Sequence, residues 1–340
     1  MSAESRYSPL LEILLRHREE PISGESISRS LGVTRSAVWK EIEALRKQGY
    51  EISSATNRGY RLERLPNQLF PQLIAFYYPD CLNRIRYYSQ TDSTNTRGQI
   101  LALEGTPDGT AVIADSQTGG SGRMGRSFHS PSGVGLYYSY VLRPDCSVEQ
   151  LSLLTSYAGL AVCHVIRRLT GLDAQIKWPN DIILDRRKVC GILTKLVSDG
   201  ESSQITHAVI GIGVNLLQDS FPEELKDKAI SLRMAGAGEV SRAQFAAELT
   251  RELDTIFLRE NWLRLRPQTA LDELKALSCT VGCPVTVSAY GEERRGRAVG
   301  IAPDGGLIVD YDDGTHETVS SGEVSVRGIL GYLPVQEGNL

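Results

Sequence analysis

The chain has 340 residues, of which 41% are hydrophobic and 23% are charged, with a formal net charge of −4. This composition is typical of a globular protein, and the length allows two or three domains. No apolar run approaches the ~20 residues of a membrane-spanning helix, which excludes an integral membrane protein of that type. The first residues lack the apolar core of a signal peptide, and six cysteines form no C-x-x-C pair or grouping with histidine. These features favour a cytoplasmic protein with reduced thiols.

A helix-turn-helix pattern opens the chain. Leucines at helical spacing predict an amphipathic helix over 8–20. Ser23 is expected to cap a short second helix, Gly32 to supply the tight turn after it, and Thr34 to cap a third helix that runs to about Gln48. The apolar side of this last helix is expected to face inward and consists of Val38, Ile42 and Leu45.

The following segment, 51–62, reads as a β-hairpin with Arg58 at its tip, so residues 1–66 are predicted to form a winged helix-turn-helix domain. This region has 11 lysines and arginines against 9 acidic residues, a net of +2, whereas the rest of the chain has a net of −6. Helix-turn-helix proteins place the second helix of the motif in the major groove of DNA. A small interaction module with solvating charges is the alternative. The predicted DNA contacts are Arg35, Ser36, Lys40 and Arg58.

The rest of the chain divides into two predicted domains. Over 67–270, strand-like and helical segments alternate, which is typical of an α+β domain built on a mixed sheet. Over 271–340, short strands separated by glycine-rich turns predict a small SH3-like barrel. The helices of the central domain are expected near 93–104, 148–170 and 241–265. Its strands are expected near 84–89, 110–115, 135–142, 174–178, 181–185, 189–197 and 205–216.

The loop Gln117–Arg126 combines four glycines with two arginines, a pattern that offers backbone N–H and guanidinium groups to a phosphate-bearing ligand. It lacks the P-loop pattern. Gly120–Gly125 spell G-x-G-x-x-G, but β-rich residues follow where a dinucleotide-binding motif would open a helix. Lys177-Trp-Pro-Asn-Asp181 and Lys188-Val-Cys-Gly191 add charged groups but no obvious activated nucleophile. The combination favours activation of a bound acid as a phosphate ester over hydrolysis.

These motifs, in this order, resemble those of the bifunctional biotin–protein ligases that double as biotin operon repressors. The resemblance covers nearly the whole chain and also includes Asp92-Ser-Thr-Asn95 and Ile210-Gly-Ile-Gly-Val-Asn215. It implies that the biotin carboxylate attacks the α-phosphate of ATP to give biotinyl-5′-adenylate. The biotinyl group then passes to a lysine of a carrier domain, that of the biotin carboxyl carrier protein of acetyl-CoA carboxylase.

The resemblance also implies roles for individual residues. Positive side chains would neutralise the charge that builds up as an anion approaches ATP, with Mg²⁺ on the phosphates and no dedicated metal site. The implied catalytic residues are Lys188, Arg123, Asp181 and Arg126. The implied biotin-binding residues are Ser93, Thr94, Asn95, Gln117, Gly120, Ser121, Gly122, Arg123, Lys188, Gly191 and Gly211, of which Gly211 would make room for the ligand. The implied ATP- and adenylate-binding residues are Arg123, Arg126, Lys177, Asn180, Lys188 and Asn215.

One motif position admits more than one interpretation, and another departs from the family pattern. Asp181 could orient the acceptor lysine amine or join the metal shell, and the segment Trp178–Asp181 could also be only a turn. Ser121 stands where the family loop, G-R-G-R-x-G-R, usually has its first arginine. We therefore expect this chain to retain the adenylate less tightly than the family pattern implies.

The resemblance further implies a homodimer on palindromic operator DNA, favoured by the adenylate and formed through sheet edges near Ile192–Val197. Two other functions remain open. A lipoate–protein ligase would share the catalytic plan, and a repressor could sense biotin without ligating it. The presence of both Lys188 and Asp181 argues against the second alternative.

Overall fold

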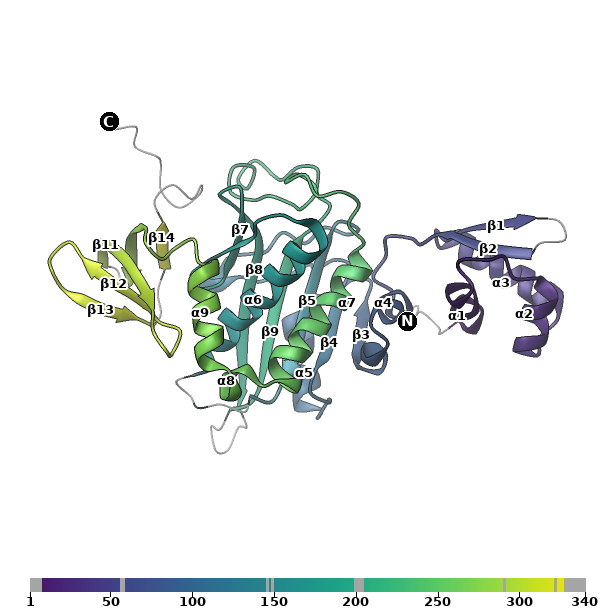
Figure 1. The fold of residues 1–340 in the computed structure, drawn as a ribbon, viewed down its shortest axis with the longest axis horizontal. Helices are drawn as coiled ribbons and strands as arrows, with labels where there is room; N and C mark the ends of the chain where they lie inside the picture. The colour runs from purple at the N-terminus through teal and green to yellow at the C-terminus, as the bar shows by residue number, and fades with distance from the viewer. Residues whose placement is uncertain are drawn as a thin grey trace.

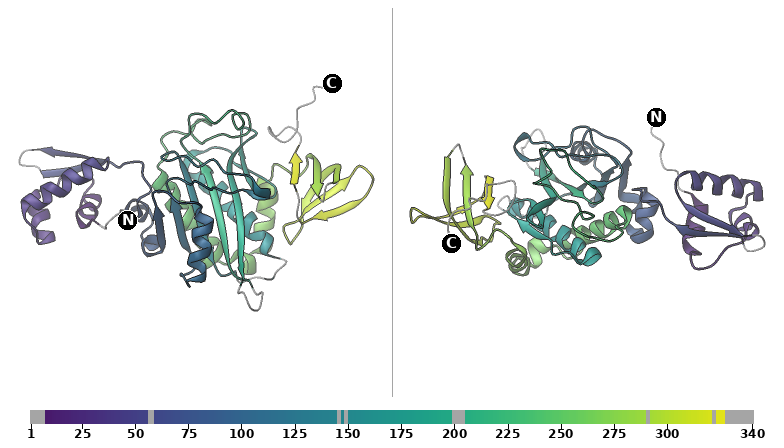
Figure 2. Two further views of the ribbon diagram at one scale, coloured as in Figure 1. Left: turned by 180° about the vertical axis from the view of Figure 1, so that it is seen from behind. Right: turned by 90° about the horizontal axis from the view of Figure 1, so that it is seen from above.

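The computed structural model describes residues 8–55, 59–144, 147, 150–198, 205–289, 292–320 and 323–326. Figure 1 shows a large central domain between two small ones, and the two further views in Figure 2 show the same arrangement. The predicted fold class is confirmed: an N-terminal helix-turn-helix, a central domain with a mixed sheet, and a C-terminal antiparallel sheet.

The N-terminal domain has the predicted caps and turn. Ser23 and Thr34 accept hydrogen bonds from the backbone N–H groups of Ser26 and Ala37, and Gly32 ends α2 with φ at 66°. The first helix is shorter than predicted because Leu15 is its last apolar residue and only charged or polar residues follow before Pro21. The elements are α1 (Pro9–Arg16), α2 (Gly24–Leu31), α3 (Arg35–Lys47), β1 (Glu51–Ala55) and β2 (Gly59–Arg64).

All seven predicted strands of the central domain are present, with ends shifted by a few residues. They are β3 (Ile85–Tyr88), β4 (Thr110–Ala114), β5 (Gly135–Leu142), β6 (Gln175–Lys177), β7 (Asp181–Leu184), β8 (Arg187–Ser198) and β9 (Ile205–Asn215). Their order in the sheet is β3-β4-β5-β9-β8-β7-β6. Only β3 and β4 pair in parallel, so the sheet is mixed.

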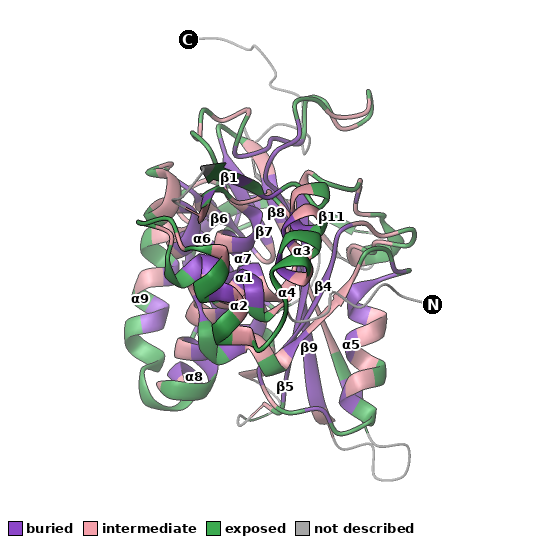
Figure 3. Ribbon diagram, turned by 90° about the vertical axis from the view of Figure 1, so that its right-hand side faces the viewer, coloured by how far each residue is buried: buried purple, intermediate pink, exposed green. Residues whose placement is uncertain are grey.

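Helices cover both faces of this sheet. α6, α7 and α9 lie on one face and α5 lies on the other (Figures 1 and 2). Figure 3 shows that the strands are buried beneath helices whose outer sides are exposed. The helices are α4 (Pro71–Tyr77), α5 (Thr94–Leu103), α6 (Leu151–Thr170), α7 (Arg242–Leu253), α8 (Trp262–Leu265) and α9 (Pro267–Leu277), with short helical turns at Pro79–Arg84 and Arg123–Gly125.

The helical segment predicted near 241–265 is interrupted. α7 ends at Leu253, a wider helical turn follows over Asp254–Arg259, and Asn261 adopts a positive φ of 39° before α8. The chain departs from the α-helix where Asp254 is buried and accepts hydrogen bonds from Tyr78, Tyr140 and Arg84. Tertiary hydrogen bonding therefore overrides local helix propensity here.

The C-terminal strands are β10 (Pro284–Ala289), β11 (Glu292–Ile301), β12 (Leu307–Tyr311), β13 (His316–Val319) and β14 (Glu323–Val326), in the order β13-β12-β11-β10-β14. β13 is short, and its residues are mostly exposed and polar. The boundary predicted at 270/271 falls inside α9, which packs against α6 and β11.

Trp178 belongs to the core of the C-terminal domain, although it comes from the central one. Its side chain is 4% exposed and packs with Val285, Val309 and other apolar residues of that domain. The indole N–H donates to the carbonyl of Gly305, and the Trp178 backbone N–H donates to the Thr280 hydroxyl. The motif Lys177–Asp181 is thus fixed from behind by the neighbouring domain.

Candidate active site

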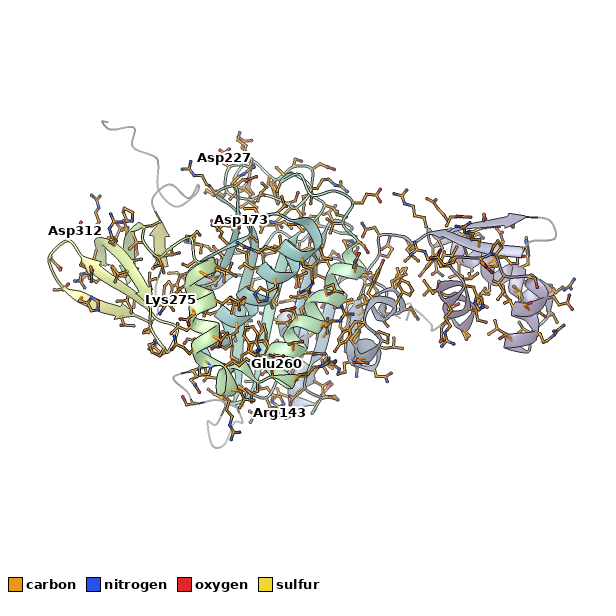
Figure 4. All side chains as sticks on the ribbon, viewed as in Figure 1. Arg143, Asp173, Asp227, Glu260, Lys275 and Asp312 are labelled. Atoms are coloured by element: carbon orange, nitrogen blue, oxygen red, sulfur yellow. The ribbon has the colours of Figure 1, made fainter. Side chains whose placement is uncertain are left out.

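A pocket of about 470 Å³ lies at the start of α5 and collects most of the predicted site residues. Its floor is the α5 face of β5, β8 and β9. The loops that carry the motifs lie at the end of the sheet where Asp227 is labelled in Figure 4, and Arg143 marks the opposite end. The predicted residues that line the pocket are Ser93, Thr94, Asn95, Gln117, Ser121, Gly122, Arg123, Asn180, Lys188, Gly191 and Gly211.

Hydrogen bonds connect the start of α5 to the loop after β4. The side-chain oxygen of Gln117 accepts from the backbone N–H of Thr94 at 2.8 Å and from the Thr94 hydroxyl at 3.2 Å. The Gln117 amide N–H donates to Ser130 at 3.0 Å. Ser93 precedes the helix without capping it, so its hydroxyl is left to line the pocket.

Asp92, which precedes these residues, is held as a carboxylate. The Thr91 hydroxyl donates to Asp92, and this bond together with the Ser93 backbone N–H keeps the pKa of Asp92 below its usual range. Arg97 lies 3.1 Å from the same carboxylate. The backbone carbonyl of Asp92 accepts from the N–H of Gly119, which joins this segment to the glycine-rich loop.

Glycines of the sheet floor leave space for side chains of the site. A Cβ at Gly211 would come within 2.4 Å of the Asn95 amide, one at Gly213 within 2.6 Å of the Phe128 ring, and one at Gly191 within 2.8 Å of the Lys188 ammonium. Gly211 lines the pocket, and its role in making room for the ligand stays a prediction. The space above Gly211 is taken by Asn95, which donates to the carbonyl of Leu193 and accepts from Ser139.

The loop Gln117–Arg126 is held mainly by backbone hydrogen bonds. The backbone N–H of Gly122 donates to the backbone carbonyl of Arg126, and the carbonyl of Gly120 accepts from the N–H of Phe128. Ser121, Met124 and Arg126 are exposed, and Met124 has a positive φ of 55°. No helix follows the glycines before β5, in agreement with the rejection of a dinucleotide-binding motif.

Arg123 connects this loop to the other side of the pocket. Its guanidinium donates to the side-chain oxygen of Asn180 at 3.3 Å, and the Asn180 amide donates to the carbonyl of Ile192 at 3.0 Å. Trp178–Asn180 form a tight turn between β6 and β7. The same turn places Asn180 in the pocket.

Lys188 and Asp181 form an ion pair beside the pocket. The Lys188 ammonium lies 2.7 Å from an Asp181 carboxylate oxygen, with the lysine side chain 30% exposed and the aspartate 8%. Lys188 is also fixed through its backbone, because its N–H donates to the backbone carbonyl of Lys228 and its carbonyl accepts from the backbone N–H of Ile230. A positive group is thus held at the pocket wall by a buried carboxylate.

Five predicted site residues do not line the pocket: Gly120, Arg126, Lys177, Asp181 and Asn215. Gly120 supports the loop from behind, since a Cβ there would lie 2.6 Å from the carbonyl of Phe128. Lys177 is buried opposite Asp181 in the β6–β7 pairing. Asn215 is buried at the end of β9, where it accepts a hydrogen bond from Gln218.

Sequence reasoning missed several pocket residues. Phe128 and Tyr137 pack edge to face and supply apolar surface above Gly213, a residue of the predicted Ile210–Asn215 motif. Alternation along β5 could have found Tyr137, because it is paired in register with Gly213 and shares its sheet face. Phe128 lies in a loop and carries no such periodic signal.

The described residues hold no cluster of three or more histidines, cysteines and carboxylates that could bind a metal ion. Five of the six cysteines are described, and all are free thiols. Burial raises the pKa of Cys163 to about 12 and that of Cys190 well above the usual range, so neither is a reactive thiolate. In the part of the chain that the structure describes, no helix has the length and apolar character to cross a bilayer.

The outer side of α3 carries the predicted DNA contacts. Arg35, Ser36 and Lys40 are exposed, and Arg35 pairs with Glu25 on α2 at 2.6 Å. Arg58, the fourth predicted contact, lies outside the described residues. Trp39 was not predicted, yet 54% of it is exposed beside these groups. Its position four residues after Arg35, away from the apolar side of the helix, was the available signal.

Family comparisons match each of the three parts. Residues 87–215 match the biotin/lipoate A/B protein ligase family. Residues 6–61 match an HTH domain family, and residues 280–327 match the biotin protein ligase C-terminal domain family.

Individual relatives are similar over nearly the whole chain. The bifunctional ligase/repressor BirA of Bacillus spizizenii is 35% identical over 316 residues, covering 92% of this chain and 96% of that protein. BirA of Escherichia coli is 31% identical over 320 residues, covering 94% and 97%. Among solved structures, the biotin protein ligase from Aquifex aeolicus in complex with biotin and ATP is 27% identical with a TM-score of 0.57, covering 72% of this chain and 98% of that one.

Proposed function

This chain belongs to the family of bifunctional biotin–protein ligases and repressors, and we propose how its residues carry out the two activities. It is a biotin–protein ligase that uses biotin and ATP, and it is a repressor through its helix-turn-helix domain. One observation supports the ligase mechanism most directly. Residues from four separate motifs, represented by Thr94, Arg123, Asn180 and Lys188, line a single pocket.

In the first step, an oxygen of the biotin carboxylate attacks the α-phosphorus of ATP, and pyrophosphate leaves. Lys188 is proposed to stabilise the charge on the carboxylate and α-phosphate, because its ammonium is partly exposed at the pocket wall. Arg123 can close over the reacting groups from the loop. Asp181 keeps the ammonium in place, since breaking a partly buried ion pair is costly.

Biotin is proposed to lie on the floor formed by β5, β8 and β9. Its ureido ring needs a few convergent donors and acceptors inside a mainly apolar pocket. Ser93, Thr94 and Gln117 supply the polar groups at one end. Phe128 and Tyr137 supply apolar surface.

Mg²⁺ is proposed to arrive with the phosphates of ATP, where it would neutralise their charge. The donor set fits this mode, because Mg²⁺ is usually held by one or two carboxylates together with substrate phosphates. Asp181 is the carboxylate available beside the pocket. Arg126, Lys177 and Asn215 lie outside the pocket lining, so we propose roles for them in positioning ATP rather than biotin.

In the second step, the ε-amine of a carrier lysine attacks the acyl carbon, the amide forms and AMP leaves, while the amine loses a proton. The proposed acceptor is the carrier domain of acetyl-CoA carboxylase. Asp181 is proposed to accept a hydrogen bond from the incoming amine while it keeps Lys188 in place. Ser121 leaves no cation at the position of the first arginine of the family pattern, which is why we propose weaker retention of the intermediate.

For repression, α3 is proposed to enter the major groove of operator DNA with Arg35, Ser36 and Lys40. A ligand-favoured homodimer would supply the second half-site. The second half of β8 is a suitable edge for it: β7 pairs with β8 as far as Gly191, Asn180 bonds Ile192, and from Leu193 to Ser198 the strand pairs with β9. Leu196, 42% exposed, lies on this segment.

A single labelling experiment tests the ligase half. The full chain, ATP and a carrier domain are incubated with biotin or with lipoate, and the carrier is analysed by mass spectrometry. We expect an ATP-dependent biotin adduct on one lysine and no lipoyl adduct. Preferential lipoylation would overturn the substrate assignment. Operator binding that responds to biotin without any carrier adduct would identify a sensing repressor instead.

A further inference from the structure

Arg242, the first residue of α7, is 0% exposed and joins two segments that are distant in sequence. On one side, the guanidinium donates twice to the backbone carbonyl of Asn67, at 3.2 and 3.0 Å. The Arg242 backbone N–H donates to the Asn67 side chain at 2.8 Å. Asn67 belongs to the segment that leaves the DNA-binding domain after β2.

The other side of the same guanidinium contacts both ends of the loop between β4 and β5. It lies 2.7 Å from the Asp115 carboxylate, which directly follows β4, and 3.3 Å from the carbonyl of Gly135, where β5 begins. The second Asp115 oxygen accepts from the Ser132 hydroxyl. The β4–β5 loop, which contains Gln117–Arg126, therefore starts and ends on residues that Arg242 contacts.

A guanidinium group is planar and rigid, so it cannot follow one set of partners without moving away from the other. A buried cation that loses a partner is strongly disfavoured. Displacement of Asp115 would consequently disturb the hold on Asn67, and displacement of Asn67 would disturb the base of the loop. Asn67 is further tied to the start of α7 by donating to the carbonyl of Val240 at 2.9 Å.

We propose that Arg242 is a positioning residue. It couples the segment after β2, at Asn67 (the linker), to the two ends of the β4–β5 loop that contains Gln117–Arg126. Contacts of the linker then affect how firmly the loop retains the adenylate. By thermodynamic linkage, the adenylate then changes the affinity for operator DNA by the same factor by which operator DNA changes the affinity for the adenylate. This inference rests on the proposed function, because it needs a chain that forms the adenylate and binds operator DNA.

Two variants of the full chain, Asn67→Ala and Arg242→Lys, test the coupling. Each is measured for the dissociation rate of preformed biotinyl-5′-adenylate and for operator affinity with and without biotin and ATP. We expect adenylate dissociation to become at least about fivefold faster, and the ligand-dependent change in DNA affinity to shrink by a similar factor. Asn67→Ala carries the test if Arg242→Lys fails to fold.

Arg251→Met is the matched control. Arg251 lies on the same helix and donates to the carbonyl of Tyr77, away from the loop and from Asn67. It should lower the melting temperature without changing either functional readout. Equal changes in Arg251→Met and Asn67→Ala, or wild-type values in Asn67→Ala, overturn the coupling. A wild-type chain that forms no adenylate, or whose DNA affinity ignores it, overturns the proposed function as well.

Discussion

The two sides of the pocket are built differently. The Gln117–Arg126 loop is largely exposed and is held by backbone hydrogen bonds, with Met124 and Arg126 facing away from any core. The hairpin from Lys177 to Gly191 is largely buried, and Trp178 fixes its turn in the core of the C-terminal domain. One side can adapt to a ligand, whereas the other provides a rigid surface.

This difference suggests a division of labour in the reaction. Charge stabilisation is most effective when the charged group is already in place before the transition state forms. Lys188, paired with Asp181 on the rigid side, meets that requirement. Retention of the intermediate instead needs a segment that can close and open, which suits the loop. Three predictions test this division, beginning with the largest expected effect.

Lys188→Ala should reduce adenylate formation by about 10²–10³-fold or more, because it removes a preorganised positive charge from the reacting centre. ATP–pyrophosphate exchange measures the loss, and circular dichroism checks the fold. Lys228→Ala is the control, since Lys228 is exposed and adjacent but contributes only its backbone to Lys188. Near-normal exchange in a folded Lys188→Ala protein would remove this residue from the mechanism.

The sequence predicted much of this architecture because local signals were consistent with the tertiary fold. Ser23, Gly32 and Thr34 act as the predicted caps and turn, and strand-like runs marked every strand of the central sheet. The loop and lysine motifs could be recognised from the sequence because each is a compact block of unusual composition. The structure brings residues of both motifs to one pocket.

Long-range packing could not be predicted in the same way. The position of Asn95 over Gly211 depends on a contact between α5 and β9 that no local pattern encodes. The burial of Trp178 in another domain has the same origin. Asp181 was expected to act on the acceptor amine or a metal, and its ion pair with Lys188 became visible only once β7 and β8 were paired.

Gly211→Ala should weaken biotin binding by roughly tenfold and destabilise the chain by about 1–3 kcal/mol, the usual range for overpacking a buried site. The new methyl group would displace Asn95, which is 4% exposed and hydrogen-bonded to Leu193. Calorimetric titration with biotin and thermal unfolding are the measurements. Gly125→Ala on the loop is the comparison: its φ of 74° adds strain, but no atom lies within 4 Å of the new Cβ. Equal biotin affinities in the two variants would contradict a rigid floor.

The smallest effect is expected in the loop itself. Arg123→Gly should leave adenylate formation within about tenfold of wild type but release more of the intermediate, because the hydrogen bond to Asn180 that connects loop and hairpin is lost. Released mixed anhydride acylates nearby lysines, so biotin on a bystander protein reports the leak. Ser121→Arg is the reciprocal variant. Ser121 is exposed at the pocket, and a second cation there should reduce bystander labelling below the wild-type level. If both variants label bystanders as wild type does while keeping ordinary ligase activity, the loop does not retain the adenylate, and the rigid side alone must hold it.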